Sequence, residues 1–419
     1  MTETQPGTTS PIQERLILLV LATVQFTSIV DFMVIMPLEP QLKRTIGLTP
    51  DKFALVVAAY TLAAGIAGLI STLVLDRFAR RPTFLALFAG FTLGTLACGV
   101  APDYLSLLAA RALTGVFGGV LGGMALTIIG DVFPENRRGA ATGVLMMSFS
   151  MASTLGVPIG LTLGQEYGWH RPFLVLAGLC VPFFALASAV LPRLDGHLKN
   201  QRREEPLARL RGIFLEANHL RAFALTSALM FGGFSVIPFL SPYLVANVGV
   251  VETQLRWVYV AGGVVTLVGM PIIGRLADRF GKLRVYRFLI PANAAMLFLM
   301  TCLPPLPLVM VLLAVSALML TNAGRMVPAM AMITSSVEPR IRGGFMGANS
   351  AVQHIAASLG TIVAGLILVE PKNSPIENFP IVGVLAAATS LLTLWLAGRL
   401  RSSSPKAAEV PVAVAEFAS

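Results

Sequence analysis

The sequence predicts an all-α integral membrane protein, with twelve transmembrane helices arranged as two pseudo-symmetric six-helix bundles. Three observations lead to this fold class. The chain of 419 residues is 55% hydrophobic and only 12% charged, its apolar segments recur along nearly the whole length, and its second half repeats motifs of its first half. Since soluble domains carry about 25% charged residues, most of this surface is expected to face lipid.

Each apolar segment is long enough to span a bilayer, because about 20 helical residues cross the hydrocarbon core. The first six spans are predicted at about 15–42, 53–75, 82–101, 104–132, 140–165 and 172–192. The second six are predicted at about 220–247, 255–277, 285–303, 306–334, 343–369 and 378–398. The chain therefore divides into a cytoplasmic segment 1–14, a bundle 15–192, a polar cytoplasmic linker 193–218, a second bundle 219–398 and a tail 399–419. The tail is rich in Ser, Ala and Pro and is expected to be disordered.

The basic residues predict the orientation in the membrane. If both termini are cytoplasmic, 23 of the 31 Lys and Arg residues lie in inner segments and six lie in outer loops. Short cytoplasmic loops are enriched in Lys and Arg, so this bias places both termini inside a multi-pass protein of the inner or plasma membrane. The net charge of +10 is then mostly an orientation signal and predicts no nucleic-acid partner.

The second half of the chain repeats the first at an offset of 202 residues. Pro40 aligns with Pro242, and the tripeptide 76–78 (Asp-Arg-Phe) aligns with the identical tripeptide 278–280. An ordered series of matches at one offset indicates a duplication, with six helices in each half. Halves of this kind place a substrate site between them, near the bilayer midplane.

The loop from Gly274 to Lys282 (GRLADRFGK) resembles the signature loop of the major facilitator superfamily, which joins helices 2 and 3 and recurs between helices 8 and 9. In the first copy both glycines are lost, while the acid and the basic cluster remain. An Asp beside several Arg at a helix end can pair across an inner gate and release again; the alternative is a basic loop that only sets topology. The gating residues predicted from the two copies are Asp76, Arg77, Arg80, Gly274, Asp278, Arg279, Gly281 and Lys282.

Two further segments extend this resemblance to residues 15–398. Arg111 to Gly115 resembles the helix 4 motif of the superfamily. Gly156, Pro158 and Gly160 resemble a degenerate form of the helix 5 motif of its antiporters. The chain is most similar to the twelve-helix drug:proton antiporters and the related arabinose-efflux-like exporters, which implies transport of a small molecule across the membrane.

Asp31 is the one acidic residue that lies deep in a predicted span. An ionisable residue inside the membrane is costly and is a functional hypothesis by default. We therefore interpret Asp31 as the proton-coupling site, and the resemblance implies that Arg111 of helix 4 relays protons beside it. The alternative is a fixed Asp31–Arg111 pair that holds helices 1 and 4 together.

Polar residues in the middle of other spans are candidates for substrate binding. Arg325 has no acidic partner at its depth once Asp31 is assigned to Arg111, and it could hold an anionic substrate group. Alternatively, Arg325 reaches Asp278 or helix-end carbonyls. Three uncharged residues complete the predicted substrate site: Gln25, Asn322 and Gln353. A structural, hydrogen-bonded role is favoured for His354.

The leading functional prediction is a proton-driven exporter of small amphipathic or anionic compounds, working as a monomer by alternating access. The alternative is a facilitator or importer of a small metabolite, of the sugar or amino acid type, without proton antiport. An enzyme is not predicted, because the four histidines are scattered and no acidic pairs have metal-ligand spacing. The expected partners are the substrate, protons and the bilayer, with no cofactor and no metal.

Overall fold

The computed structural model describes residues 11–192, 194–195, 206–338, 341–371, 375–401 and 403. In this part of the chain, twelve helices are long and apolar enough to cross a membrane. The described residues contain no sheet, and their only extended pairing is one bridge between Val369 and Glu377. The predicted fold class is confirmed. The tail predicted to be disordered lies almost entirely outside the described residues.

The N-terminal half spans residues 11–190. Its helices are α1 (Pro11–Val34), α2 (Glu39–Ile46), α3 (Pro50–Val74), α4 (Arg80–Gly99), α5 (Tyr104–Val132), α6 (Glu135–Met151), α7 (Val157–Tyr167) and α8 (Arg171–Val190). A π-helical turn joins α6 to α7, and together these form one span.

The C-terminal half follows a short helix, α10 (Pro206–Leu215), in the linker. Its helices are α11 (Ala217–Tyr243), α12 (Leu255–Phe280), α13 (Lys282–Thr301), α14 (Leu308–Gly324), α15 (Met326–Ser335), α16 (Arg342–Ile367) and α17 (Phe379–Arg399). Helices α14 and α15 together form one span.

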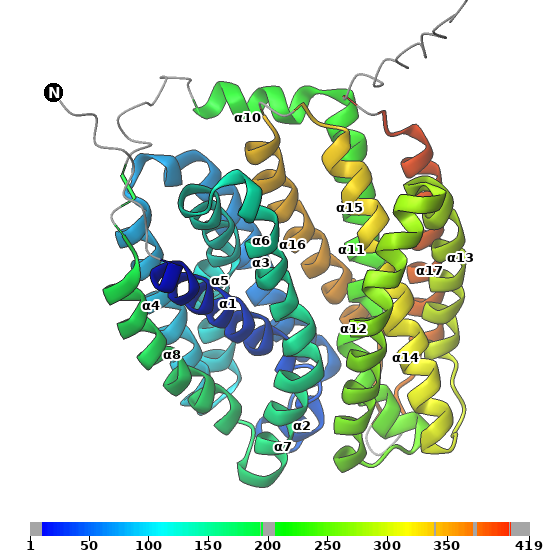
Figure 1. Cartoon of the computed structure of the whole chain (residues 1–419). Coiled ribbons are helices and arrows are strands. Elements are labelled where there is room, and N and C mark those ends of the chain that lie inside the picture. The colour runs from blue at the N-terminus through cyan, green and yellow to red at the C-terminus, as the bar shows by residue number, and fades with distance from the viewer. Residues whose placement is uncertain are drawn as a thin grey trace, which may run out of the picture.

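The two halves stand side by side, and α10 crosses one end of the molecule from one half toward the other (Figure 1). We call this end the linker end, and the end that carries α2 the opposite end. The halves meet where α3 packs along α16 and where α7 and its π-helical turn pack against α12. A substrate path between the halves is therefore bordered by these four helices.

Buried apolar side chains form three clusters, which show where the halves touch. The largest cluster combines residues of both halves, with Phe53 and Phe239 in ring contact at 6.0 Å between centroids. The second cluster belongs to the N-terminal half alone and the third to the C-terminal half and the linker helix. The common core lies toward the opposite end, and the separate cores lie toward the linker end. The halves are thus packed together at the opposite end and apart at the linker end.

The first predicted span, 15–42, ends earlier than the hydropathy indicates. Helix α1 stops at Val34, and the remaining residues form a turn and the short helix α2. Pro37 and Pro40 explain the break, because proline lacks the amide hydrogen of a helix interior and restricts the residue before it. The separate α2 places a charged segment at the opposite end.

The fifth membrane span consists of α6, the π-helical turn (Ala152–Gly156) and α7, and the turn ends two residues before Pro158. Proline at this position removes a backbone hydrogen bond, and a π-turn is a common way to accommodate such a defect. Next to it, a Cβ on Gly156 would lie 2.2 Å from Val30 Cγ2, and a Cβ on Gly160 would lie 2.6 Å from Val34 Cγ2. These glycines therefore let the fifth span pack closely against α1 beside Asp31.

The glycines of α5 allow a similarly close contact with α3. A Cβ on Gly115 would lie 2.2 Å from the carbonyl oxygen of Tyr60, and a Cβ on Gly119 would lie 2.6 Å from Ala64 Cα. Small residues let backbones approach in membrane bundles, where packing and not water drives association. The glycines of α5 therefore let its backbone approach α3 closely.

Candidate functional site

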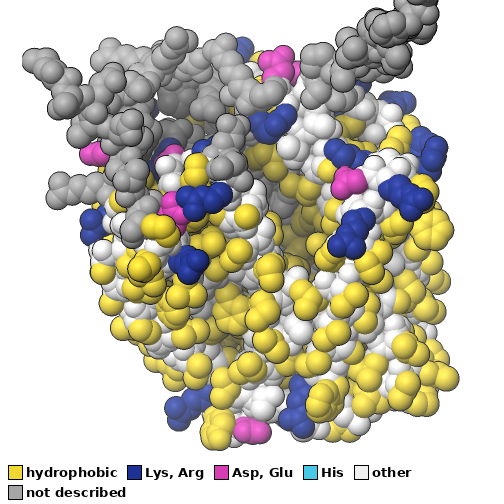
Figure 2. All heavy atoms as spheres, in the orientation of Figure 1, with side chains coloured by type: hydrophobic (Ala, Val, Ile, Leu, Met, Phe, Trp, Pro, Cys, Tyr) yellow, Lys and Arg dark blue, Asp and Glu magenta, His cyan; other side chains and the backbone are white. Residues whose placement is uncertain are grey.

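A cavity of about 820 Å³ lies between the two halves. It begins at the aromatic side chains of Phe32 and Tyr60 and extends to Arg80, Ile213 and Gly343 at the linker end. Figure 2 shows a hollow between the halves on the same side. Because the halves are packed together at the opposite end, the cavity is accessible from the linker end.

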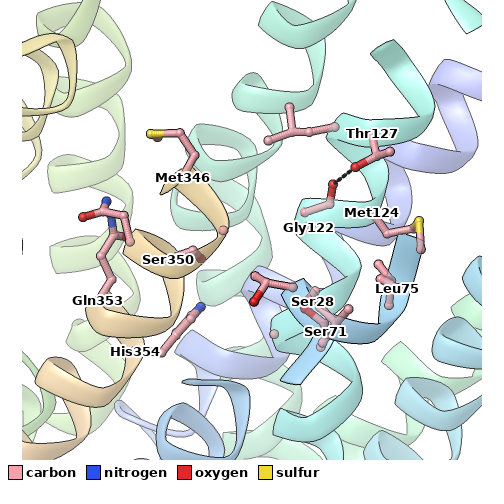
Figure 3. A pocket seen from close by; sticks show the side chains of 18 of the residues that line it. Ser28, Ser71, Leu75, Gly122, Met124, Thr127, Met346, Ser350, Gln353 and His354 are labelled. Atoms are coloured by element: carbon pink, nitrogen blue, oxygen red, sulfur yellow. Dashed lines mark hydrogen bonds between the residues drawn. The ribbon is translucent and has the colours of Figure 1, made fainter. Parts of the chain in front are cut away.

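The two walls of the cavity differ in chemistry. In the N-terminal half, α5 contributes four glycines, Gly118, Gly119, Gly122 and Gly123, so much of this wall is backbone. In the C-terminal half, α16 presents polar side chains, which lie across the cavity from α1, α3 and α5 (Figure 3). The polar residues of α16 in the lining are Asn349, Ser350, Gln353 and His354.

The cavity is nearly uncharged. None of the described lining residues carries a carboxylate, and Arg80 at the rim is the one cation among them. Apolar side chains such as Ile29, Phe32 and Met346 lie between the polar ones. Pockets of this kind bind compounds mainly through apolar surface, with a few polar groups that orient them. The lining therefore suits a small amphipathic compound.

Asp31 and Arg111 form an ion pair immediately behind this wall. Arg111 Nη1 donates to Asp31 Oδ2 at 2.8 Å and to the Asp31 carbonyl oxygen at 3.1 Å, and both side chains are 0% exposed. Asp31 Oδ1 and the Nε and Nη2 atoms of Arg111 have no hydrogen-bond partner among the described residues. The pair of the alternative interpretation is thus present, and the proton-coupling role of Asp31 stays a prediction. The hydrogen-bonding capacity of the pair is only partly used, which leaves room for a second arrangement.

Arg325 lies at the break between α14 and α15, which together form one membrane span. Pro328 explains the break because it cannot donate to the carbonyl oxygen of Gly324. The guanidinium is buried in the C-terminal half and donates to Ser390 Oγ at 3.0 Å, to the Leu229 carbonyl oxygen at 3.0 Å and to Asn322 Oδ1 at 2.7 Å. Arg325 is thus held by neutral groups.

The predicted substrate residues fall into two groups. Gln25 and Gln353 line the cavity, from α1 and α16, and Gln353 Nε2 lies 3.6 Å from the sulfur of Met330. Arg325 and Asn322 are not among the lining residues, so a direct contact of these two with substrate stays a prediction. The geometry brings Gln25 and Gln353 together at the cavity, whereas Asn322 lies with Arg325, to which it is hydrogen-bonded at 2.7 Å.

The two copies of the gate loop have different backbone conformations. In the second copy, α12 continues to Phe280 and the chain turns through Gly281 at φ +92°, a value that favours glycine. At the matching position of the first copy, Ala79 has φ −62°, and α3 ends in a 3₁₀ turn that includes Arg77. The lost glycine is therefore matched by a different helix end. The side chain of Asp76 lies outside the described residues.

At the linker end, the ion pairs between described residues each lie within one half. Arg80 Nε lies 3.5 Å from Asp131 Oδ2, and Arg137 Nη1 lies 2.9 Å from Glu14 Oε2. On the other loop, the guanidinium of Arg279 lies over the ring of Phe280. Among the residues whose side chains are described, no ion pair joins the two loops in this conformation, and their pairing across a closed gate stays a prediction.

Ionic contacts at the opposite end join the two halves. Lys43 and Arg44 of α2 pair with Glu370 and Glu252 of the C-terminal half, and Arg44 Nη2 lies 2.9 Å from Glu252 Oε2. Gln165 Nε2 also donates to the Glu252 carbonyl oxygen at 2.6 Å. These contacts would have to break before the cavity could open at the opposite end.

Glu39 lies among these ion pairs with only 4% of its surface exposed. Burial, together with the nearby carboxylates of Glu370 and Glu252, raises the pKa of Glu39 to about 8, against the opposing effect of Lys43 and Arg44. A carboxyl group in this position holds its proton while the opposite end is closed.

A family model for the Major Facilitator Superfamily matches residues 21–236 and residues 222–418, once for each half. The chain belongs to this superfamily. It is therefore a multi-pass membrane transporter and not an enzyme.

Relatives within the superfamily support the same conclusion. The inner membrane transport protein YdhP of Escherichia coli is 25% identical over 366 residues, which is 87% of this chain and 91% of YdhP. The putative transporter AraJ of Escherichia coli is 22% identical over 254 residues, or 60% of this chain and 62% of AraJ.

Two solved structures have the same fold. A bacterial homologue of the human lysosomal transporter Spinster, in an inward-facing and unoccupied conformation, has a TM-score of 0.74 at 17% identity, covering 94% of this chain and all of that one. A D-xylose–proton symporter has a TM-score of 0.74 at 14% identity, covering 91% of this chain and 97% of that one. At these identities the likeness establishes the fold alone.

Several lining residues of this superfamily member are absent from the sequence prediction. Tyr60, Ser350 and Thr127 line the cavity, and so does His354, for which a structural role is favoured from the sequence. Spacing carries one usable signal, because Gln353 and Ser350 are three residues apart and therefore share a face of α16. The sequence has no equivalent signal for Tyr60.

Proposed function

We propose that the protein is a proton-coupled exporter of small amphipathic compounds, working by alternating access as a monomer. The observation that supports this proposal best is the Asp31–Arg111 pair, fully buried at 0% exposure behind the cavity wall. Intramembrane ionisable groups are retained against a cost of several kcal/mol and usually mark ion pathways. An ion pair next to the substrate cavity can couple the movement of a proton to the movement of the substrate.

The proposed cycle uses the two protonation states of Asp31. With the opposite end open, a proton from outside neutralises the carboxylate and weakens its attraction to Arg111. As the linker end opens, the proton leaves to the cytoplasm and the ion pair then forms, which gives the conformation described above. One proton then enters for each compound exported, with the linker end and both termini on the cytoplasmic side.

The gate loops are proposed to close the linker end in the other half of the cycle. Asp278 and Arg279 of the second loop, and Arg77 and Arg80 of the first, lie at helix ends that border the open side. Opposite charges from the two loops attract one another when the halves approach there. In the present conformation α2 helps to close the opposite end, through its ion pairs with the C-terminal half.

The proposed substrate class follows from the cavity lining. Its apolar side chains and uncharged polar groups favour amphipathic compounds over strongly charged ones. The anionic alternative depends on Arg325, which would have to reach the substrate in another conformation. Gln25 and Gln353 are the proposed hydrogen-bonding contacts.

The experiment uses everted membrane vesicles with a pH gradient, monitored by acridine orange. A compound that exchanges for protons dissipates the gradient when it is added. The panel is chloramphenicol as a neutral amphipathic probe, benzoate as an anion, ethidium as a cation and D-xylose as a sugar. Asp31→Asn is expected to reduce gradient-driven exchange to the level of vesicles without the protein, because an amide cannot carry the proton.

Glu166→Gln is the matched control, since Glu166 is an exposed carboxylate at the opposite end, and it should exchange like the wild type. Full gradient-dependent exchange by Asp31→Asn would refute the assignment of the proton site. Uptake of D-xylose without any proton exchange would favour the facilitator or importer instead. A response to benzoate that Arg325→Ala abolishes would instead support anionic substrates that bind Arg325.

A further inference from the structure

The aromatic ring of Tyr60 separates the cavity from the buried ion pair. Tyr60 lines the cavity from α3, and the guanidinium carbon of Arg111 lies 4.6 Å from the centre of its ring. Asp31 and Arg111 themselves are 0% exposed and are not among the lining residues. Tyr60 therefore has the cavity on one side and the ion pair on the other.

The position of the Tyr60 hydroxyl depends on its neighbours. Its oxygen lies 3.4 Å from Ser28 Oγ, and Ser28 precedes Asp31 by one turn of α1. A Cβ on Gly118 would lie 2.4 Å from the same oxygen, so glycine is required there to leave room for the hydroxyl. The ring is thus held over Arg111 from both sides.

A chain of aromatic rings connects Tyr60 to the other half of the protein. The ring centroids of Tyr60 and Phe32 are 5.2 Å apart, and those of Phe32 and Phe234 are 5.9 Å apart. Phe234 belongs to α11 of the C-terminal half, and the other two belong to the N-terminal half. A separation of the halves at the opposite end would withdraw Phe234 from Phe32 and remove this support of Tyr60.

We propose that Tyr60 is a valve between the cavity and the Asp31–Arg111 pair. Seated on Arg111, its ring keeps cavity water from the carboxylate; displaced, it opens a path for the proton. The contact of Phe32 with Phe234 links the position of the valve to the relative position of the halves. The valve rests on the proposed proton coupling for its purpose, but its effect on water access can be measured independently.

The test measures access to Asp31 with a water-soluble carbodiimide and glycinamide on the full-length protein in nanodiscs. Mass spectrometry quantifies the labelled fraction of Asp31, relative to the exposed carboxylate of Glu166. Tyr60→Leu is expected to increase the labelling rate of Asp31 at least tenfold, because it removes the barrier and leaves the carboxylate unchanged. Tyr60→Phe, which retains the ring, is expected to label like the wild type.

Tyr259→Leu is the matched control in the C-terminal half. Tyr259 is also buried, and its hydroxyl lies 2.8 Å from Ser241 Oγ in the C-terminal half, whereas the ion pair belongs to the N-terminal half. It should leave the labelling of Asp31 unchanged. Phe234→Ala leaves the tyrosine in place and should also increase labelling, which provides a second variant if Tyr60→Leu does not fold. Equal labelling of Asp31 in the wild type, Tyr60→Leu and Phe234→Ala would overturn the valve.

A second measurement separates this proposal from the proposed function. In vesicles with a pH gradient, Tyr60→Leu should leak protons without any added compound. Increased labelling without a leak, together with normal exchange by Asp31→Asn, would support the valve and refute proton coupling at Asp31. Unchanged labelling with exchange abolished by Asp31→Asn would refute the valve and keep the proton site.

Discussion

Arg111→Met is expected to destabilise the protein by about 3–5 kcal/mol, the usual cost of removing one partner from a buried ion pair. The carboxylate of Asp31 would remain at 0% exposure without its counter-charge. The contact of the guanidinium with the ring of Tyr60 is lost as well. Stability can be followed by heating the protein in detergent with a fluorogenic maleimide, since Cys98 and Cys180 are buried free thiols that become reactive on unfolding.

The double variant Asp31→Asn with Arg111→Met is expected to recover most of this loss, because neither replacement is charged. Arg137→Met is the control, since Arg137 is half exposed and pairs with Glu14 at the linker end. Because Arg137 is solvent-exposed, its removal should cost less than breaking the fully buried pair, although the Glu14 side chain is only 10% exposed. If Arg111→Met were as stable as Arg137→Met, the carboxyl group of Asp31 would not be charged in the folded protein, and the ion pair would need another interpretation.

The ion pair could be predicted from the sequence because charge is scarce inside a membrane. Asp31 is the single acid deep in a span, and Arg111 is one of only two arginines in spans. Counting leaves Arg111 and Arg325 as possible partners of Asp31, and the resemblance of the segment from Arg111 to Gly115 to the helix 4 motif of the superfamily selects Arg111. The number of spans can also be predicted from the sequence, because the bilayer thickness sets the length of an apolar helix that crosses it.

The residues that line the cavity could not be predicted in the same way. A transmembrane helix is apolar on the face toward lipid and on the face toward other helices, so periodicity does not identify the face toward the cavity. Phe32 follows Asp31 on α1 but is itself apolar, and Tyr60 lies in the uncharged middle of α3, so neither residue type marks the face toward the cavity. Their role becomes visible only when α3 and α1 are placed beside α5.

Arg325 shows a different limit of sequence reasoning. Looking for an acidic partner leaves it unpaired and suggests a substrate contact. The structure surrounds it with a hydroxyl, a backbone carbonyl and an amide oxygen from three helices. Neutral acceptors of this kind are abundant in any sequence, so none of them is predictable as a partner. The break at Pro328, in contrast, follows from a single residue type.

Opening of the opposite end is expected to depend on pH through Glu39. In the closed conformation the pKa of Glu39 is about 8, whereas an exposed glutamate has a pKa of 4.5. Closing therefore takes up a proton between these values, and the closed conformation is most favoured at low pH. The equilibrium ratio of the closed to the open conformation should fall by up to about tenfold per pH unit as the pH rises from about 4.5 to about 8. Glu39→Gln should stay closed over this range.

The measurement is the distance between spin labels at Thr49 and Thr253, which are exposed on the two halves at the opposite end. The labels would be placed at Thr49→Cys and Thr253→Cys in a background without the native cysteines. In the wild type, the long-distance population should grow between pH 5.5 and pH 9. Glu166→Gln, an exposed carboxylate at the same end, should follow the wild type. If Glu39→Gln kept the wild-type pH dependence, another group would control this end, and the burial of Glu39 among the ion pairs of α2 would have only a packing role.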